Sequence, residues 1–205
     1  MEGRVPHAQI GLTEKVVKDL QERSLEKRLS AATIIERDIE ERLKDNDYAS
    51  VSTRILYFKQ LTQDYQNITN RRSGLFGLSF VGMAIYHKLR VSLSPPLKYK
   101  FFYIFDQNNA EMLTQAVTKF LDDMIEPITL CLQIDQDPKV LVASCDAIFN
   151  ITKCYREEVL KSRHFDAIFN NIITLIGSNS PEVREYSKKV DEKIKDTVFA
   201  CLSTK

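Results

Sequence analysis

A helix pattern recurs four times along this chain and constrains its fold more than any other feature. Its equivalent positions are Arg28, Arg71, Leu141 and Arg184, which are separated by steps of 43, 70 and 43 residues. A step near 43 residues is typical of HEAT-type helical hairpins. Such hairpins stack into a solenoid that exposes long ridges and grooves rather than a preformed catalytic cleft, so the pattern favours a protein that holds partners.

Apolar side chains recur at helical spacing within each repeat. Ile35, Ile39 and Leu43 form one such stripe, and Asp137 and Ser180, each followed by proline, are typical helix starts. We therefore predict an all-α protein, a HEAT/armadillo-like solenoid of about four antiparallel helix pairs that forms a single domain over residues 1–205. The hairpins are expected at about 12–45, 48–87, 112–155 and 163–201.

Three glycines lie in the predicted helix of the second hairpin. Gly74, Gly77 and Gly82 would each cost roughly 1 kcal/mol relative to alanine in a helix, so they require a reason. Close approach of a neighbouring helix is the usual one. The run 73–82 also resembles a phosphate loop superficially, but it lacks the G-K-[ST] ending and no strand precedes it, so helix packing is the better interpretation.

The long middle step contains an irregular insertion at about 88–111. Residues 91–107 have two prolines, then five aromatics in seven residues, and no helical period. The codons of Val91-Ser92 can have the form of a splice donor, and the codon of Gln107 can have the form of a splice acceptor. We therefore hypothesise that residues 91–107 are translated from a retained intron. The alternatives are a genuine loop, or an aromatic strand or hook that docks on a partner.

Charge and cysteine usage exclude several classes of function. The net charge of +1, from 29 basic and 28 acidic residues, provides no overall field for nucleic acid or an anionic membrane. Cys131, Cys145, Cys154 and Cys201 form no C-x-x-C pair, which predicts a reduced, cytoplasmic protein. The N-terminus lacks the features of a secretory or transit peptide, and the longest apolar run, residues 75–86, is much shorter than the roughly 20 residues that cross a bilayer.

Few residues are candidates for catalysis. Cys154 and His164 could form a thiol and base pair, but a cysteine on an apolar stripe is usually a small hydrophobic residue, and no orienting third group is indicated. Asp135 and Asp137 could be a carboxylate pair, yet Asp137 is explained as a helix cap. Neighbouring acids such as Asp122 and Asp123 point apart on a helix, and a divalent metal needs more ligands than these supply.

Basic residues could contact a lipid headgroup or an acidic partner. Acidic residues nearby make a solvated face the better interpretation for Arg71-Arg72 and for Lys153, Arg156, Lys161 and Arg163. We therefore expect that the protein is not an enzyme and that it has no catalytic residue, no cofactor and no metal site. The sequence does not identify the residues that bind partners.

Several blocks of sequence resemble a known family. Residues 24–36 (SLEKRLSAATIIE), 72–78 (RSGLFGL), 125–131 (IEPITLC) and 145–153 (CDAIFNITK) are similar, in the same order, to the N-terminal HEAT repeats of the vacuole-morphology scaffold family. That family organises the phosphatidylinositol 3-phosphate 5-kinase and the opposing phosphoinositide phosphatase, in what is called the PAS complex. The resemblance covers nearly the whole chain except the insertion.

The resemblance implies a non-enzymatic scaffold or regulator of the lipid kinase that makes phosphatidylinositol 3,5-bisphosphate. It implies that these repeats contact the kinase, and that the chain associates peripherally, through its partners, with endosome, vacuole and lysosome membranes. Family members are several times longer and self-associate mainly through a C-terminal region, so we expect weakened self-association and an N-terminal fragment or short form. The alternatives are a generic HEAT-repeat adaptor of the transport-receptor or phosphatase-scaffold type, and an inactive truncated isoform.

Overall fold

A computed structural model describes residues 12, 14–22, 24–92 and 107–203 of the 205-residue chain. This part of the chain consists of helices and contains no strand. The helices in order are α2 (Glu14–Gln21), α3 (Leu25–Lys44), α4 (Tyr48–Thr62), α5 (Ile68–Ser92), α7 (Gln107–Ile134), α8 (Pro138–Lys161), α9 (Phe165–Ile176) and α10 (Pro181–Ser203). The all-α helical-repeat prediction is confirmed.

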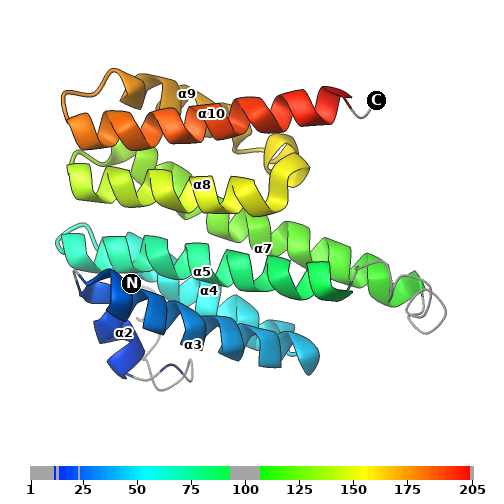
Figure 1. Ribbon diagram of the computed structural model, residues 1–205. Coiled ribbons are helices and arrows are strands. Elements are labelled where there is room, and N and C mark those ends of the chain that lie inside the picture. Colours follow the sequence, from blue (N-terminus) through cyan, green and yellow to red (C-terminus); the bar gives the residue numbers. More distant parts are fainter. Residues whose placement is uncertain (1–11, 13, 23, 93–106, 204–205) are drawn as a thin grey trace.

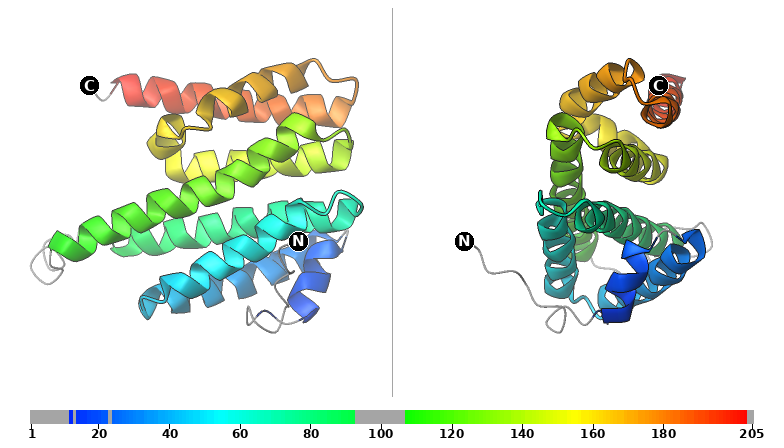
Figure 2. Two further views of the ribbon diagram at one scale, coloured as in Figure 1. Left: turned by 180° about the vertical axis from the view of Figure 1, so that it is seen from behind. Right: turned by 90° about the vertical axis from the view of Figure 1, so that its left-hand side faces the viewer.

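The helices form two layers, which Figure 1 shows from the front and Figure 2 from behind and from the side. The inner layer consists of α3, α5, α8 and α10, each packed against the next, and the outer layer consists of α4, α7 and α9. Helix α2 packs against α3 and α5. In the right-hand view of Figure 2 both ends of the stack bend toward the inner-layer side. One cluster of buried apolar side chains runs between the layers through all these helices.

The repeat register predicted from the sequence is confirmed by the inner layer. Arg28, Arg71, Leu141 and Arg184 each lie three residues after the first residue of an inner-layer helix. The residue four positions before each of them caps that helix, because its side-chain oxygen accepts a hydrogen bond from a backbone N–H of the first turn. These caps are Ser24, Asn67, Asp137 and Ser180.

The repeated arginines tie their helices to the preceding loop. Arg28 Nη1 donates a hydrogen bond to the carbonyl of Glu22 at 3.2 Å, and Arg184 Nη1 donates to the carbonyl of Ser178 at 2.7 Å. Both acceptors lie six residues before the arginine. The same contact therefore holds the inner-layer helix to the preceding loop in the first and in the fourth repeat.

The second and third repeats use a different arrangement. Leu141 has no donor at the equivalent position, and the residue six positions before it is Asp135, whose carboxylate pairs with Arg71 of the previous repeat. Both side chains are buried, and Asp135 also accepts a hydrogen bond from the backbone N–H of Asp137 at 2.9 Å. This ion pair joins the two repeats across the long middle step.

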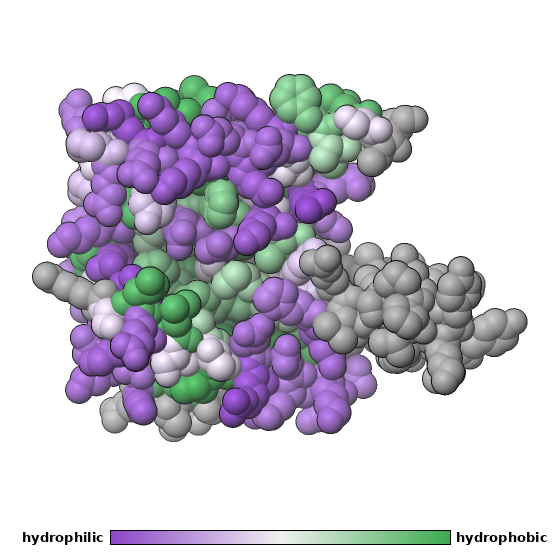
Figure 3. Space-filling view, viewed as in Figure 1, coloured by the Kyte–Doolittle hydropathy of each residue, from purple (hydrophilic) through white to green (hydrophobic). Residues whose placement is uncertain are grey.

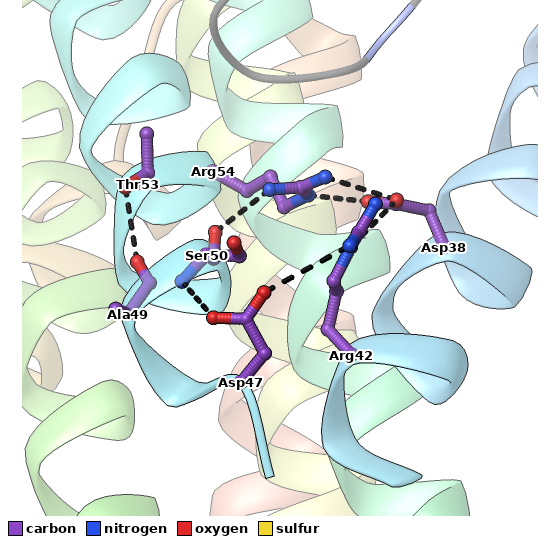
Figure 4. A network of polar contacts seen from close by, with 7 residues as sticks. All are labelled: Asp38, Arg42, Asp47, Ala49, Ser50, Thr53 and Arg54. Atoms are coloured by element: carbon purple, nitrogen blue, oxygen red, sulfur yellow. Dashed lines mark hydrogen bonds and ion pairs between the residues drawn. The ribbon is translucent and has the colours of Figure 1, made fainter. Parts of the chain in front are cut away.

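A second polar network joins α3 to α4 (Figure 4). The guanidinium of Arg54 lies against both carboxylate oxygens of Asp38, and its Nη1 donates to the carbonyl of Ser50 at 3.0 Å. Arg42 approaches Asp38 and Asp47 to 3.5 and 3.8 Å, and Asp47 caps α4. Arg54 is buried, and its two-pronged pairing with the Asp38 carboxylate offsets the cost of removing its charge from water.

Two of the three predicted close approaches at glycine occur. The run 73–82 lies wholly within α5. A Cβ atom at Gly77 would overlap the ring of Phe58 on α4, and one at Gly74 would lie 2.6 Å from the carbonyl oxygen of Phe58. Gly82 differs, because a Cβ there would make only ordinary contacts, the nearest at 3.5 Å from Met124.

Both ends of the range 88–111, expected to be irregular, are helical in the structure. Helix α5 continues to Ser92, because residues 88–92 contain good helix formers and the prolines begin only at Pro95. Helix α7 begins at Gln107, where Ala110 and Glu111 favour a helix. Residues 93–106, which make up most of the segment in the intron hypothesis, lie outside the described residues.

Helix α8 has a break that the sequence did not indicate. The third hairpin was expected to end at about residue 155, and α8 runs on to Lys161 across a kink at Arg156. Arg156 has φ 29° and ψ −98°, a conformation that costs a non-glycine residue roughly 1–3 kcal/mol. Just before the kink, the buried hydroxyl of Tyr155 donates a hydrogen bond to the carbonyl of Gly82 at 2.7 Å, which ties α8 to α5.

Candidate partner-binding surface

The solvent side of α5 is apolar. Every residue from Arg71 to Tyr86 is buried or only partly exposed, and the partly exposed ones include Phe76, Phe80 and Met83 at helical spacings of four and three. The rings of Phe76 and Phe80 stack with centroids 6.5 Å apart. Side chains at these spacings lie on one face of a helix, so α5 presents an aromatic stripe to the inner side of the stack.

Helix α8 adds a second stripe beside the first. Its partly exposed residues recur at Val142, Asp146, Phe149 and Asn150. Asn150 Nδ2 donates to Ser79 Oγ of α5 at 3.3 Å, which places the two stripes side by side. We call the combined surface the inner-face patch and define it as Arg72, Phe76, Phe80, Met83, Val142, Asp146, Phe149 and Asn150.

Figure 3 shows this arrangement on the molecular surface. Hydrophobic side chains gather in a hollowed band along the middle of the face, over α5 and α8, and hydrophilic side chains cover α10 except at its C-terminal end, where apolar side chains are exposed. Exposed charges of α10 include Glu185, Lys189 and Asp196, while α3 contributes Arg37 and Glu40. An apolar centre with a charged rim is the usual anatomy of a protein–protein interface.

One carboxyl group interrupts the apolar centre. Asp146 lies five residues after Leu141 on α8. Phe76 on α5 and Lys189 on α10 lie five residues after Arg71 and Arg184, so the three residues occupy equivalent positions on neighbouring helices. Burial raises the pKa of Asp146, and the positive charges of Arg28 and Lys189 only partly oppose that effect. Within the described part of the chain, no hydrogen bond to this carboxylate takes part in the shift.

The two cations near Asp146 also have other contacts. The guanidinium of Arg28 lies over the ring of Phe76, 5.0 Å from its centroid. The Lys189 ammonium lies 2.7 Å from a carboxylate oxygen of Glu185 and 4.8 Å from the centroid of the Tyr186 ring. Asp146 therefore shares its cations, and its charge is compensated less fully than that of a carboxylate with its own partner.

The structure does not bring Cys154 and His164 into a catalytic arrangement. Nε2 of His164 lies 3.1 Å from the Nε of Arg163, which donates a hydrogen bond to it. Burial raises the pKa of the Cys154 thiol, whereas a nucleophile needs a lowered value. Burial also raises the pKa of Cys131 and of Cys145 to about 12. These features favour the interpretation of the cysteines as small core residues.

The acidic pairs noted in the sequence have structural contacts. Asp137 caps α8 through the N–H groups of Lys139 and Val140, and Asp135 pairs with Arg71. Asp122 accepts a hydrogen bond from Ser162 at 3.3 Å. The described residues contain no group of three or more His, Cys, Asp and Glu side chains placed to hold a metal ion.

The basic residues noted in the sequence are divided among several surfaces. Lys161 pairs with Glu157 at 2.7 Å, and Arg163 approaches Asp122 to 3.8 Å. Arg72 lies over the Phe76 ring at 5.9 Å, as part of the inner-face patch. These residues form no common binding site. None of the described helices has the length and hydropathy needed to span a bilayer.

Sequence reasoning did not find the inner-face patch. It attributed the whole run 73–82 to helix packing, whereas in the structure the buried stripe of α5 consists of Leu75, Leu78, Val81 and Ile85. A signal was present, since Phe76 and Phe80 fall on the opposite side of the helix from that stripe. Aligning the repeats by Arg71 and Leu141 would have placed Asp146 beside Phe76.

Two known proteins are similar to this chain over most of its length. The chain is 22% identical to the Vacuole morphology and inheritance protein 14 of Saccharomyces cerevisiae over 91% of its own length and 18% of that protein. It is 22% identical to the Protein VAC14 homolog of Arabidopsis thaliana over 89% of its length and 20% of the relative. The chain thus spans about a fifth of these relatives. No solved structure matches it.

A family model provides the assignment. The model described as the Vacuolar 14 Fab1-binding region matches residues 69–196, from the first turn of α5 into α10. This range contains every residue of the inner-face patch. Because the match takes in more than half of the 205 residues, the chain belongs to the family of the Vacuolar 14 Fab1-binding region.

Proposed function

We propose that this chain is a non-enzymatic scaffold segment that holds a lipid kinase of the Fab1 type, the kinase that makes phosphatidylinositol 3,5-bisphosphate from phosphatidylinositol 3-phosphate. The observation that carries the proposal is the match of a Fab1-binding family model to residues 69–196. The same residues present an apolar patch with a charged rim, which suits a protein partner. Such a surface suits a role in positioning a partner.

The proposal includes where the chain works. The candidate is a peripheral component on endosome, vacuole and lysosome membranes, as part of the PAS complex. Its described helices offer no bilayer-spanning segment, and its net charge of +1 gives little attraction to anionic lipid, so its partners would recruit it. The proposed partners also include the associated phosphoinositide phosphatase, and we expect the self-association of this chain to be weak.

Co-purification tests the proposal directly. The tagged 205-residue chain is expressed in its native cells and recovered under mild conditions, and the bound proteins are identified by mass spectrometry. We expect the Fab1-type kinase in the eluate and phosphatidylinositol 3-phosphate 5-kinase activity with it.

Other outcomes would contradict the proposal. An eluate with transport cargo or a protein phosphatase catalytic subunit, and no lipid kinase, would favour a generic HEAT-repeat adaptor. An eluate with no specific partner would favour an inactive truncated form.

A further inference from the structure

We propose that the inner-face patch binds one amphipathic α-helix of the protein partner, which lies along the furrow between α5 and α8 and places a basic side chain against Asp146. The identity of the partner as a lipid kinase rests on the proposed function. The mode of binding is argued from the patch itself.

The first step concerns the shape and the composition of the patch. Phe76, Phe80 and Met83 on α5 and Val142 and Phe149 on α8 form a partly exposed apolar floor two helices wide. Helices α3 and α10 flank it with exposed charged side chains, together with some exposed apolar ones near the start of α3 and the end of α10. Removing such a floor from water is favourable in proportion to the apolar area buried, so the centre would contribute most of the binding energy.

The second step decides between a helix and an extended peptide. An extended segment leaves its backbone N–H and C=O groups to be satisfied by the surface it binds, either at a strand edge or by polar side chains. The described part of this chain has no strand, and the one side-chain amide of the patch, Asn150, already donates to Ser79. A helix satisfies its own backbone and can lie on an apolar floor without that cost.

The third step concerns length. From Arg72 to Tyr86 the solvent side of α5 extends over 14 residue steps, which at 1.5 Å each is roughly 21 Å. A partner helix of about four turns would cover this length. Neighbouring helices pack with axes about 8–10 Å apart, so one helix fits between the ridges of α3 and α10.

The fourth step concerns charge. Asp146 is the one carboxylate of the patch, and its nearest cations, Arg28 and Lys189, are shared with Phe76 and Glu185. A lysine or arginine at the edge of the partner's apolar stripe would give this carboxylate a direct, charge-assisted hydrogen bond. The patch therefore selects a helix whose apolar face carries a basic residue on one side.

Peptide binding to the whole 205-residue chain tests this mode. The probes are overlapping fluorescent 20-residue peptides that cover the sequence of the Fab1-type kinase, titrated by fluorescence anisotropy. We expect a peptide with apolar residues at helical spacing and a flanking lysine or arginine to bind. Its circular dichroism should show a gain of helix on binding.

Substitutions identify the surface. Phe80→Ser should weaken binding of that peptide by tenfold or more, as expected at the centre of an interface. Leu56→Ser is the matched control, since Leu56 is an exposed apolar residue on α4 of the outer layer, and it should leave the affinity within twofold. Met83→Ser serves as a second variant of the patch if urea unfolding shows that Phe80→Ser is poorly folded.

A charge exchange provides the most specific test. Asp146→Lys should weaken the peptide about tenfold, and replacing the basic residue of the peptide by glutamate should restore its affinity for the Asp146→Lys chain. A peptide that binds in an extended form, an affinity that neither Phe80→Ser nor Asp146→Lys changes, or the absence of any binding peptide would overturn the helix mode. Co-purification of the kinase in the same preparation would show that the scaffold function stands even then.

Discussion

Two aspartates of the third repeat, eleven residues apart, lie in opposite environments. Asp135, in the loop before α8, is buried, pairs with Arg71 and accepts a backbone hydrogen bond. Asp146, on α8, is half-buried at the surface and shares two cations that have other contacts. Each carboxylate oxygen of Asp135 has its own partner, whereas the charge of Asp146 is only partly compensated. The difference separates a residue that holds the fold from one that is available to a partner.

Removing the carboxylate of the junction should have the largest effect. Asp135→Ala leaves the buried guanidinium of Arg71 without its counter-ion, and such a loss typically lowers the free energy of unfolding by about 3–5 kcal/mol. Urea denaturation followed by circular dichroism measures it. The paired variant with Arg71→Met and Asp135→Leu should recover most of the loss, because it leaves no unpaired charge. Equal stability of Asp135→Ala and the native chain would contradict the comparison.

The two sides of α5 should respond differently to an added methyl group. Gly77→Ala forces a Cβ into the Phe58 ring and should lower the free energy of unfolding by about 1–3 kcal/mol or more. Gly82→Ala has room for the methyl and should raise it by up to about 1 kcal/mol, through helix propensity. Thermal unfolding of the two variants checks the opposite signs. Destabilisation of similar size in both would show that Gly82 is also closely packed.

The hydrogen bond beneath the patch should have a moderate effect. Tyr155→Phe removes the buried hydroxyl that donates to the Gly82 carbonyl and leaves the ring packed against Tyr86, so the free energy of unfolding should fall by about 1 kcal/mol. Urea unfolding measures the loss. The control is Tyr65→Phe at an exposed tyrosine, which should change the stability very little.

The smallest effect is expected at Asp146, and its sign is the informative part. Because the pKa of Asp146 is raised in the folded chain, its ionised form opposes folding at neutral pH despite Arg28 on α3 and Lys189 on α10. Asp146→Asn should therefore be slightly more stable than the native chain at pH 7. The gain should disappear as the pH falls through the raised pKa, where Asp146 is itself neutral. Stability curves of both chains against pH test this, and a loss of stability at pH 7 would mean that the carboxylate contributes to the fold.

The sequence predicted the parts of the fold that depend on local chemistry. The helix caps at Asp137 and Ser180 and the register of Arg28 and Arg184 follow from short-range preferences of the sequence. The ends of α5 and α7 were misplaced because the aromatic run beside them masks the helical period.

Contacts between repeats could not be predicted in the same way. Arg71 and Asp135 are 64 residues apart, and Tyr155 and Gly82 are 73 apart, so nothing local relates the partners. The inner-face patch was missed for a related reason, since partly exposed apolar residues look like core residues until the neighbouring helices are in place.

The tie between Arg71 and Asp135 is one of three polar contacts that hold the middle of the stack together. Together with the Tyr155–Gly82 and Asn150–Ser79 hydrogen bonds, it aligns the second and third repeats through contacts that do not involve residues 93–106. These three contacts come from groups of α5, of α8 and of the residues just before α8, so the alignment of the two repeats is built into the faces that they present to each other.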